Sequence, residues 1–472
     1  MIGQSAFSQN ILFNDTLFKH RLIDNGIDIN FDGEISYTEA AAVTNLDVSH
    51  GWNFYPIADM SGIEYFINLD TLNFSGNNLS SVNLSNNIQL QYLDASQNYN
   101  LDTLILGSNS FLEQINLNGV NTNSIFDFSG LPNLIKLEFD NATDLDMTSN
   151  ANLRTLLCRF SKGQINVSNN PSLETLVCQG QSHLDLSSCS QLEYLQCYGD
   201  SIKLDSIDLS NNPLLSELTL WQNNLSHIDL SQNTALQQVE LGYNHIPHID
   251  FSNNVNITYL SCGGDSLRSV DITGLLNLQT LGTGNFLDSL SSNLDSIDLT
   301  TNVNLKHLYC PAGNLTHLDL SHNTLLQDLH CGYNNLDTII ICSIPNFTYL
   351  HCDGMPQLTH VFIVNTSSPP GYYSFGSSNW QFYSCTLLSV EENSKDANID
   401  IFPNPVSQSL NIRNLTGIEN ISFEIIDINS KVVLQNHLSS NLIDVNKIKS
   451  GIYVLRLLKS NSIIIRKCFV KE

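Results

Sequence analysis

An acidic loop near the amino terminus carries the clearest chemistry in this sequence. Oxygen-bearing side chains recur at every second position from residue 28, and a glycine follows the third of them at residue 33. A cation of the size of Ca²⁺ takes six to eight oxygen ligands, which carboxylates and amides on a tight turn supply. Gly33 permits the sharp turn, and the last carboxylate closes the site with both oxygens. The predicted calcium ligands are Asp28, Asn30, Asp32, Glu34, Ser36 and Glu39.

The loop matches D-x-[DN]-x-[DN]-G-x5-E at every position and resembles the calcium loop of EF-hand and dockerin proteins. An amphipathic stretch over residues 15–23 is expected as the entering helix, and residues 37–43 as a short exiting helix. The loop is single, without the pairing of sensor proteins, so we expect its Ca²⁺ to be structural. The alternative is an Asp- and Asn-rich turn that imitates the pattern without binding a cation.

Aromatic, acidic and histidine residues recur at matching positions of a repeated pattern between residues 192 and 353. Each lies two, four, six or seven residues after the residue that opens a repeat unit, mostly on positions predicted to point outward. Tyrosine and tryptophan are prominent on recognition surfaces, so the set is a candidate binding face for a protein, peptide or glycan. The alternative is cross-strand packing that only steadies a sheet. The candidate ligand-binding residues are Tyr194, Tyr198, Glu217, Trp221, Glu240, Tyr243, Tyr259, His307, Tyr309, His330, Tyr333, Tyr349 and His351.

Two histidines of this set, His330 and His351, occupy the same position in successive units, with Asp328 and Asp353 close by in the pattern. Histidine and aspartate are common transition-metal ligands, so a metal site is one interpretation. The other is a row of solvated side chains. The pattern favours the second interpretation, because the sequence shows nothing of the residues that would orient metal ligands.

The elements that position these residues repeat along the chain. Units of the form L-x-x-L-x-[LC]-x-x-N-x-L-x-x-L-D-L-x-x-N begin at Leu215, Leu236, Leu305 and Leu326, with a step of 21 residues within each group. Apolar residues at positions 0, 3, 5, 10, 13 and 15 predict two short strands with their apolar sides inward. Asparagines at positions 8 and 18 are expected to bond to backbone groups or to each other. A fixed period in the twenties indicates stacked coils that bury their apolar faces against one another.

This pattern resembles bacterial leucine-rich repeats of the 21-residue class over about residues 63–364. The resemblance implies parallel strands wound into a flattened, curved solenoid. Seven of the 11 cysteines occupy the inward position 5, where thiols serve as small apolar groups. Stacked coils place neighbouring thiols at the margin of disulfide geometry, and three stacked thiols cannot all pair. We therefore predict reduced thiols at Cys158, Cys178, Cys197, Cys262, Cys310, Cys331 and Cys352.

The repeat stops near residue 365, and residues 398–472 change to short separate strands with turn residues between them. Seven such strands predict a small β-sandwich. Four landmarks resemble the type A C-terminal sorting domain of type IX secretion, which implies export across both membranes of the cell and an interaction with the type IX machinery. These landmarks are the segments at residues 402–405, 427–433, 450–454 and 466–471. Ser430 departs from the pattern, which usually has glycine there.

The expected fold is mostly β: a curved leucine-rich-repeat solenoid with parallel strands, a small helical N-terminal cap and a C-terminal antiparallel β-sandwich. Residues 1–8 contain Ala6-Phe7-Ser8, which is similar to the cleavage end of a signal peptide. The predicted segments are a signal-peptide remnant at 1–8, a cap with the calcium loop at 9–62, the solenoid at 63–364, a cap and linker at 365–397, and the sorting domain at 398–472.

The charge and the missing motifs narrow the function. Asp and Glu number 46 against 19 Lys and Arg, giving a net charge of −27, which argues against nucleic acid as a partner and against anionic membranes. The sequence contains no apolar run long enough for a transmembrane helix and no common catalytic fingerprint. We predict a secreted or cell-surface binding protein without enzymatic activity, whose partner is an extracellular protein or glycan. The alternatives are a surface hydrolase and a purely structural cell-surface protein.

Overall fold

The computed structural model describes residues 9–50, 55–121, 126–263, 267–284, 293–342, 344–363, 371–373, 381–384, 400–402, 406–413, 421–427, 431–449, 451–459 and 462–471. The chain divides into two compact units: Met1–Asn335 with His351–Asp353, and Leu336–Leu350 with Gly354–Glu472. The predicted signal-peptide remnant, most of the predicted cap and linker at 365–397, and the Pro403-Asn404-Pro405 part of the first sorting landmark lie outside the described residues.

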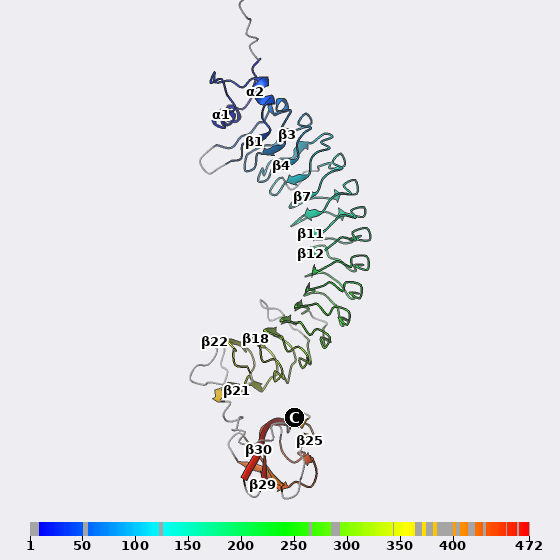
Figure 1. The fold of residues 1–472 in the computed structure, drawn as a ribbon, viewed down its shortest axis with the longest axis vertical. Helices are drawn as coiled ribbons and strands as arrows, with labels where there is room; N and C mark the ends of the chain where they lie inside the picture. The colour runs from blue at the N-terminus through cyan, green and yellow to red at the C-terminus, as the bar shows by residue number, and fades with distance from the viewer. Residues whose placement is uncertain are drawn as a thin grey trace, which may run out of the picture. The chain divides into compact units, whose positions relative to one another are not determined.

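Two short helices precede the solenoid in the first unit (Figure 1). Helix α1 (Thr16–Asp24) begins after Asp15, whose carboxylate accepts from the Leu17 N–H at 2.7 Å, and it buries Phe18 and Leu22. Helix α2 (Tyr37–Ala41) begins with a capping box formed by Ser36 and Glu39. The calcium-loop motif therefore joins two helices, as the sequence predicts. A 3-10 helix, η1 (Ile63–Tyr65), leads into the regular coils.

The strands of the solenoid form one long parallel sheet in which equivalent positions of successive coils are directly paired. This sheet lines the inner side of the curved coil stack in the first unit (Figure 1). Its strands there, in order, are β1 (Asn45–Asp47), β2 (Thr71–Asn73), β4 (Tyr92–Asp94), β6 (Gln114–Asn116), β7 (Lys136–Glu138), β9 (Thr155–Leu157), β11 (Thr175–Gln179), β12 (Tyr194–Tyr198), β13 (Glu217–Thr219), β14 (Gln238–Glu240), β15 (Tyr259–Ser261), β16 (Thr280–Gly282), β17 (His307–Tyr309) and β18 (Asp328–His330).

The second arm of the coils carries shorter strand pairs. β3 (Ser81–Asn83) pairs with β5 (Thr103–Ile105), and β8 (Leu145–Asp146) pairs with β10 (Ile165–Asn166), both in parallel. His351, the last residue of β20 (Tyr349–His351), continues the long sheet after β18, because its carbonyl accepts from the Cys331 N–H at 2.9 Å. The predicted parallel solenoid is confirmed.

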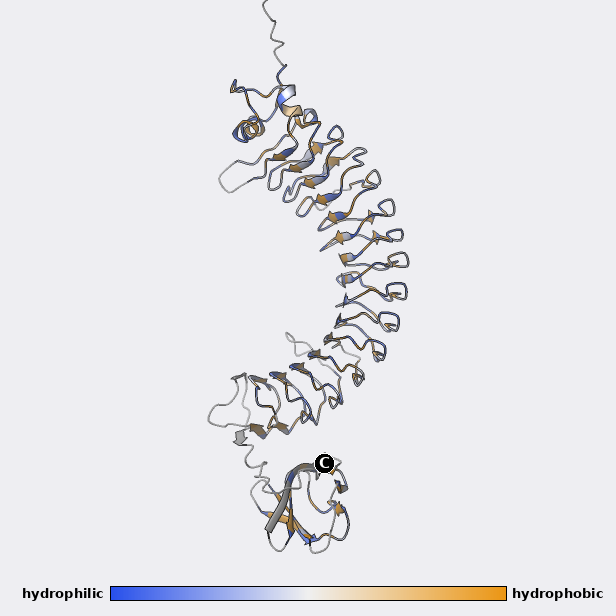
Figure 2. Cartoon of the chain, in the orientation of Figure 1, coloured by the Kyte–Doolittle hydropathy of each residue, from blue (hydrophilic) through white to orange (hydrophobic). Residues whose placement is uncertain are grey.

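The leucine ladder fills the interior of the coils. In the unit that begins at Leu215, the residues at positions 0, 3, 5, 10, 13 and 15 are all at most 5% exposed. Hydrophobic residues recur on the strands of successive coils (Figure 2). Burying a leucine side chain contributes about 1.5–3 kcal/mol, so many stacked coils together supply the core of an elongated array.

Two columns of asparagine close the bends of the coil. At position 8, Asn244 donates through Nδ2 to the carbonyls of Leu220 and Leu241, both at 2.9 Å, and its Oδ1 accepts from the Leu225 N–H at 3.0 Å. At position 18, Asn233 donates to the carbonyls of Leu209 and Asn212 at 3.0 and 2.9 Å. These amides thus satisfy backbone groups of adjacent coils, and the expected bonds between stacked amides do not form at these positions.

The cysteines at position 5 are buried and reduced, as predicted. Cys178 and Cys197 face each other in the register of β11 and β12. Burial raises the pKa of the Cys262 and Cys310 thiols to about 12. Because only the thiolate is reactive, these side chains act as small apolar core residues.

The second unit begins with parallel strands and ends with antiparallel ones. β19 (Thr338–Ile340), β21 (His360–Ile363) and β23 (Gln381–Ser384) form a parallel sheet, and β22 spans Gly371–Tyr373. The seven predicted strands of the sorting region are all present, in sheets ordered β24-β25-β28 and β27-β26-β29-β30 around a shared core that includes Leu410, Ile425 and Leu455. They are β24 (Asp400–Phe402), β25 (Ser409–Arg413), β26 (Ile421–Asp427), β27 (Val432–His437), β28 (Leu442–Asp444), β29 (Gly451–Lys459) and β30 (Ser462–Lys471).

Candidate functional site

The predicted calcium loop is folded by bonds from its own backbone to its acidic side chains. Asp28 accepts from the Asp32 and Gly33 N–H groups at 3.2 and 2.9 Å. Glu39 accepts from the Ile29 and Ser36 N–H groups at 3.0 and 2.8 Å, which ties the end of the loop to its start. Gly33 takes a φ of 80°, the left-handed turn that the motif requires. The carboxylates of the first and last residues of the motif, Asp28 and Glu39, are therefore both held by backbone N–H groups of the loop.

The remaining predicted ligands have separate roles in the loop. The Glu34 carboxylate points to α1 and pairs with the Lys19 ammonium group at 2.6 Å, so only its backbone carbonyl remains for a cation. The Ser36 hydroxyl caps α2, and the Asn30 amide donates to Asp32 at 3.1 Å. Across the described part of the chain, no three or more His, Cys, Asp or Glu side chains gather closely enough to hold a metal ion.

The burial of Asp28 and Glu39 is the observation that fits a cation at the loop. The two residues are 6% and 5% exposed, and within the described residues neither carboxylate forms a salt bridge. Buried carboxylates are usually paired with a cation or coordinate a metal. The loop thus offers oxygen ligands of the correct type and order, with two negative charges that backbone N–H groups alone satisfy.

The predicted ligand-binding residues form two columns on the inner sheet. Position 2 pairs Tyr194 with Glu217, Gln238 with Tyr259, and His307 with Asp328 across neighbouring strands, and position 4 pairs Thr219 with Glu240 and Tyr309 with His330. Except for the exposed Gln238, these side chains are half-buried because they pack against their neighbours in the column. Tyr349 on β20 is also half-buried, whereas Tyr333 is 48% exposed.

Three aromatic side chains pack edge to face where three successive inner strands end. We call Tyr198, Trp221 and Tyr243 the aromatic row. The ring centroids of Tyr198 and Trp221 are 6.2 Å apart, and those of Trp221 and Tyr243 are 4.9 Å apart, with interplanar angles of 80° and 84°. A Cβ atom on Gly242 would lie 2.9 Å from Cδ1 and Nε1 of the indole. The missing side chain at Gly242 therefore makes room for Trp221.

The residue at position 7 of several coils has a left-handed backbone conformation with positive φ, which glycine adopts most easily. Gly76, Gly119 and Gly180 occupy it in some coils, but Tyr243 and Tyr333 occupy it with φ of 58° and 57°. Gln97, Gln222 and Ala312 adopt the same conformation in other coils, so the geometry of the coil sets it. Phe160, at φ 59° and 61% exposed, belongs to the same column. Sequence reasoning missed Phe160, although its place seven residues after Leu153 was the available sign.

A glutamate–tyrosine pair lies beside the aromatic row. Burial raises the pKa of Glu240, while a hydrogen bond with Tyr259 acts in the opposite direction. Burial and the neighbouring Glu240 both raise the pKa of Tyr259. On the next coils toward the amino terminus, the Tyr194 hydroxyl donates to Gln196 at 2.7 Å. This part of the inner sheet therefore combines aromatic rings with oriented hydrogen-bonding groups.

The histidines of the inner sheet gather at the last coils of the first unit. The histidine cluster consists of five residues that make three close contacts among them, namely His307, Asp328, His330, His351 and Asp353. His307 Nδ1 lies 2.7 Å from Asp328 Oδ2, His330 Nδ1 lies 3.2 Å from His351 Nδ1, and His351 Nε2 lies 2.9 Å from Asp353 Oδ2. Burial and the neighbouring His351 lower the pKa of His330 to about 4, against an opposing effect of Asp328. The expected row of separate, solvated side chains is therefore replaced by a packed cluster.

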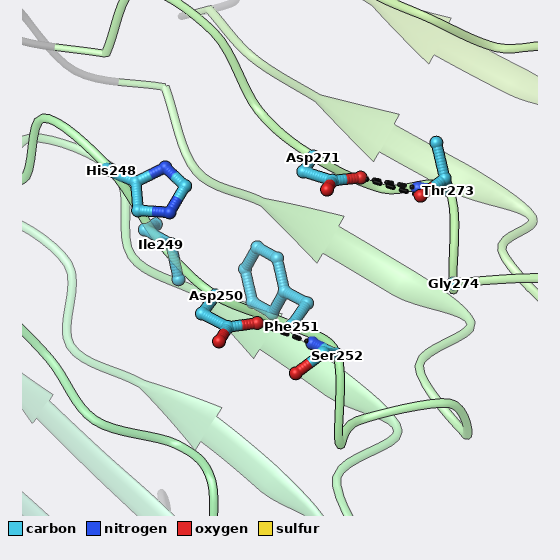
Figure 3. A pocket seen from close by; sticks show the side chains of 8 residues that line it. All are labelled: His248, Ile249, Asp250, Phe251, Ser252, Asp271, Thr273 and Gly274. Atoms are coloured by element: carbon cyan, nitrogen blue, oxygen red, sulfur yellow. Dashed lines mark hydrogen bonds between the residues drawn. The ribbon is translucent and has the colours of Figure 1, made fainter.

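A cleft of about 370 Å³ lies on the second arm of two coils and was not anticipated (Figure 3). Asp250 and Asp271 line it, and each carboxylate accepts from the backbone N–H two residues later, at 2.8 and 3.1 Å. These bonds, together with side-chain bonds to Ser252 and Thr273, lower the pKa of both carboxyl groups. The recurring Asp-x-Ser/Thr pattern was the available sign in the sequence. The cleft is acidic and disfavours anions.

The described residues contain no helix with the length and apolar character needed to cross a membrane. No curated protein matches the chain. Among solved structures, the functional domain of InlJ from Listeria monocytogenes, described as including a cysteine ladder, matches with a TM-score of 0.57 at 21% identity, covering 98% of this chain and 100% of that one. The leucine-rich-repeat ectodomain of the receptor kinase GASSHO1/SCHENGEN3 from Arabidopsis thaliana gives a TM-score of 0.47 at 18% identity, over 76% of this chain and 53% of that one.

Residues 400–471 match the family model of the secretion system C-terminal sorting domain. This match confirms the sorting domain that the sequence landmarks indicated. The similarity to InlJ shows the fold of the preceding coils. The chain is therefore a secreted or outer-cell-surface protein that has a leucine-rich-repeat-like solenoid and carries a type IX sorting domain at residues 400–471.

Proposed function

We propose that this protein is a binding protein without enzymatic activity, which recognises an extracellular protein, peptide or glycan on the inner sheet of its solenoid. The observation that carries the proposal is the aromatic row next to the Glu240–Tyr259 pair. Tyrosine and tryptophan supply large contact areas, and the oriented polar groups supply hydrogen bonds to a ligand.

One feature of this surface favours recognition over simple stabilisation. Glu240 is held partly buried with a raised pKa, which disfavours its charged form. A sheet selected only for stability would avoid this burial, so we expect the surface to bind a partner that makes use of it.

Probing glycan and extracellular-protein arrays with the full chain tests this proposal. We expect Trp221→Ala and Tyr259→Ala to weaken binding of any captured ligand by at least about 2 kcal/mol, or roughly 30-fold, as for central interface aromatics. Gly242→Ala is a subtler variant, because it displaces the indole of Trp221 without removing it. Phe111→Ala, at a residue 51% exposed and outside the inner strands, is the matched control. Unchanged affinity in all the sheet variants would contradict the proposal.

We propose further that the loop at residues 28–39 binds a structural Ca²⁺ ion. Its support is the full motif, the left-handed Gly33 and the buried carboxylates of Asp28 and Glu39. Asp28, Asn30, Asp32 and Glu39 would supply side-chain oxygens, and Glu34 its backbone carbonyl. The side chains have to move inward, because no such group of carboxylates is gathered in the described structure. The bound ion would offset the charge of the two buried carboxylates and stiffen the start of the solenoid.

Thermal unfolding with and without millimolar Ca²⁺ tests this second proposal. We expect Ca²⁺ to raise the melting temperature of the full chain and Glu39→Gln to abolish the rise, because binding to the native state adds its free energy to stability. Glu34→Gln is the matched control, since it removes only the pair with Lys19 and leaves the backbone carbonyl in place. An equal melting temperature with and without Ca²⁺, together with no heat of binding, would exclude the ion.

A further inference from the structure

Two imidazole rings of the histidine cluster face each other across adjacent coils. His330 and His351 have ring centroids 5.1 Å apart at an interplanar angle of 63°, and their Nδ1 atoms are separated by 3.2 Å. Each neutral imidazole carries one proton and one lone pair, so two nitrogens approach this closely only if a proton or a cation lies between them. In the described structure a hydrogen bond between the two Nδ1 atoms fulfils this role.

We propose that Nδ1 of His330 and Nδ1 of His351 form a bidentate site for a divalent transition-metal ion such as Zn²⁺, Ni²⁺ or Cu²⁺. With metal–nitrogen bonds of about 2.1 Å, a separation of 3.2 Å corresponds to an N–metal–N angle of about 100°. That angle lies between octahedral and tetrahedral values. The observed spacing accepts a metal once the Nδ1 proton of His330 moves to its Nε2 atom and both rings turn to direct their Nδ1 lone pairs at the ion.

Asp353 fixes the ring of His351 in the orientation that the site requires. Its carboxylate is 4% exposed and lies 2.9 Å from His351 Nε2. The proton of His351 is thus assigned to Nε2, which leaves the Nδ1 lone pair directed toward His330. A carboxylate behind a ligating histidine is the common arrangement that sets the tautomer and raises ligand basicity in metal sites. Asp353 is therefore a positioning residue in this proposal.

The electrostatic surroundings are compatible with a cation. Asp328 contacts His307 at 2.7 Å and Asp353 contacts His351 at 2.9 Å, so the cluster holds two carboxylates and three imidazoles. Within the described residues no three potential ligands converge, so the protein supplies two nitrogens and water or a bound partner's group completes the coordination. Imidazole ligands select such metals over Ca²⁺ and Mg²⁺, which prefer oxygen.

Calorimetric titration of the full chain with Zn²⁺, in excess Ca²⁺ to saturate the acidic loop, tests the site. We expect one Zn²⁺ per chain, with binding lost in His330→Ala and in His351→Ala. Asp353→Asn should weaken binding about 10- to 100-fold while retaining both ligands, as for other residues behind ligating histidines. His322→Ala, at an exposed histidine outside the cluster, is the matched control and should bind as the parent chain does. Circular dichroism of each variant verifies the fold.

Electron paramagnetic resonance of the unaltered chain loaded with Cu²⁺ gives a readout that needs no variant. Two equivalent nitrogen couplings support the site, and a spectrum with only one nitrogen coupling would contradict it. Stoichiometric Zn²⁺ binding that persists in the His330→Ala/His351→Ala double variant would overturn the proposal. So would the absence of binding to the parent chain at submillimolar Zn²⁺. The site is independent of the proposed ligand-binding role of the aromatic row, so either proposal can fail alone.

Discussion

At the scale of single residues, the asparagines at positions 8 and 18 explain how a chain with very short strands closes its coils. A turning backbone leaves carbonyl and N–H groups without partners, and these cannot remain buried and unpaired without cost. Asn233 is fully buried and donates to two carbonyls of the preceding coil. Its role is therefore backbone satisfaction, which a leucine or alanine cannot supply.

Replacing this asparagine should be costly although no apolar contact is lost. We expect Asn233→Ala to lower the free energy of unfolding by about 1–3 kcal/mol, because the carbonyls of Leu209 and Asn212 each lose one of two hydrogen bonds. Urea unfolding of the full chain measures the effect. Gln232→Ala, at the exposed neighbouring residue, should shift the midpoint very little. Equal stability of the two variants would contradict the role assigned to the asparagine column.

The histidine cluster predicts how the stability of the folded protein changes with pH. The pKa of His330 is about 4 in the folded protein and 6.5 as the ordinary value, so the unfolded chain binds more protons between these limits. The stability associated with neutral His330 is complete above pH 6.5 and is lost as the pH falls toward 4. The other titratable side chains around His330 are His307, Tyr309, Asp328, His351 and Asp353.

We therefore expect His330→Asn to flatten the loss of stability between pH 6.5 and 4. The measurement is the urea-unfolding midpoint of the parent chain and of the variant across this interval. If the variant is less stable at pH 7, the two midpoints should converge as the pH falls. His322→Asn serves as the control, because His322 is exposed. A constant difference between parent and His330→Asn at all pH values would contradict the assignment.

At the scale of elements, the stacking of inner strands buries a column of thiols. Burial raises the pKa of the Cys158 thiol, and a hydrogen bond with Cys197 together with burial raises the pKa of the Cys178 thiol. A buried thiol with a raised pKa is protonated at neutral pH and reacts slowly. The column therefore gives compact filling between coils without requiring an oxidised state.

Thiol labelling measures this property directly. We expect the position 5 cysteines to resist a water-soluble disulfide reagent in the native chain and to react once urea unfolds the solenoid, so that labelling follows unfolding. Peptide mapping after labelling separates these thiols from the other cysteines. Fast labelling of Cys178 or Cys331 in the folded protein would show that the column is accessible.

The inner sheet shows what the sequence could and could not predict. Alternation of apolar and polar residues is a local property, so the inward Leu218 and the outward Glu217 were assigned correctly from the pattern. Contacts between coils depend on register, ring orientation and the space left by small residues. The packing of Trp221 over Gly242 and the close approach of His330 to His351 therefore could not be read from a single repeat unit.

The sequence also did not predict which residues at position 7, just after the inner strands, form an exposed column. The left-handed conformation at position 7 is dictated by the coil and not by the residue that occupies it, since Gly180 and Phe160 adopt it alike. The importance of Phe160 was therefore missed. The calcium loop was recognisable because its ligands are neighbours in sequence, yet the diversion of Glu34 to Lys19 depends on the position of α1.

At the scale of the whole molecule, the chain combines a leucine-rich-repeat-like solenoid with a sorting domain that carries its own core. The sorting domain assigns the protein to the type IX route and to the cell exterior. The solenoid contributes the extended sheet, and its acidic charge disfavours nucleic acids and anionic membranes as partners. These features together support a protein that is exported in order to bind.

Deleting residues 400–471 should remove export and leave the solenoid in place. We expect the shortened protein to be lost from the exterior of a cell that has a type IX system and to accumulate inside its outer membrane, because the sorting domain is the segment recognised for export. Fractionation and immunoblotting measure the distribution. Full export of the shortened chain would contradict the assignment of the sorting role to these strands.

Hydroxyl-radical footprinting of the full chain, with and without a captured ligand, tests most directly whether the inner sheet is the binding surface. The method reports the solvent access of individual Trp and Tyr side chains. We predict that the ligand protects Trp221, Tyr243 and Tyr259 from oxidation and leaves Phe111 unchanged. Unaltered oxidation of the aromatic row, with protection confined to residues outside the inner sheet, would contradict the account.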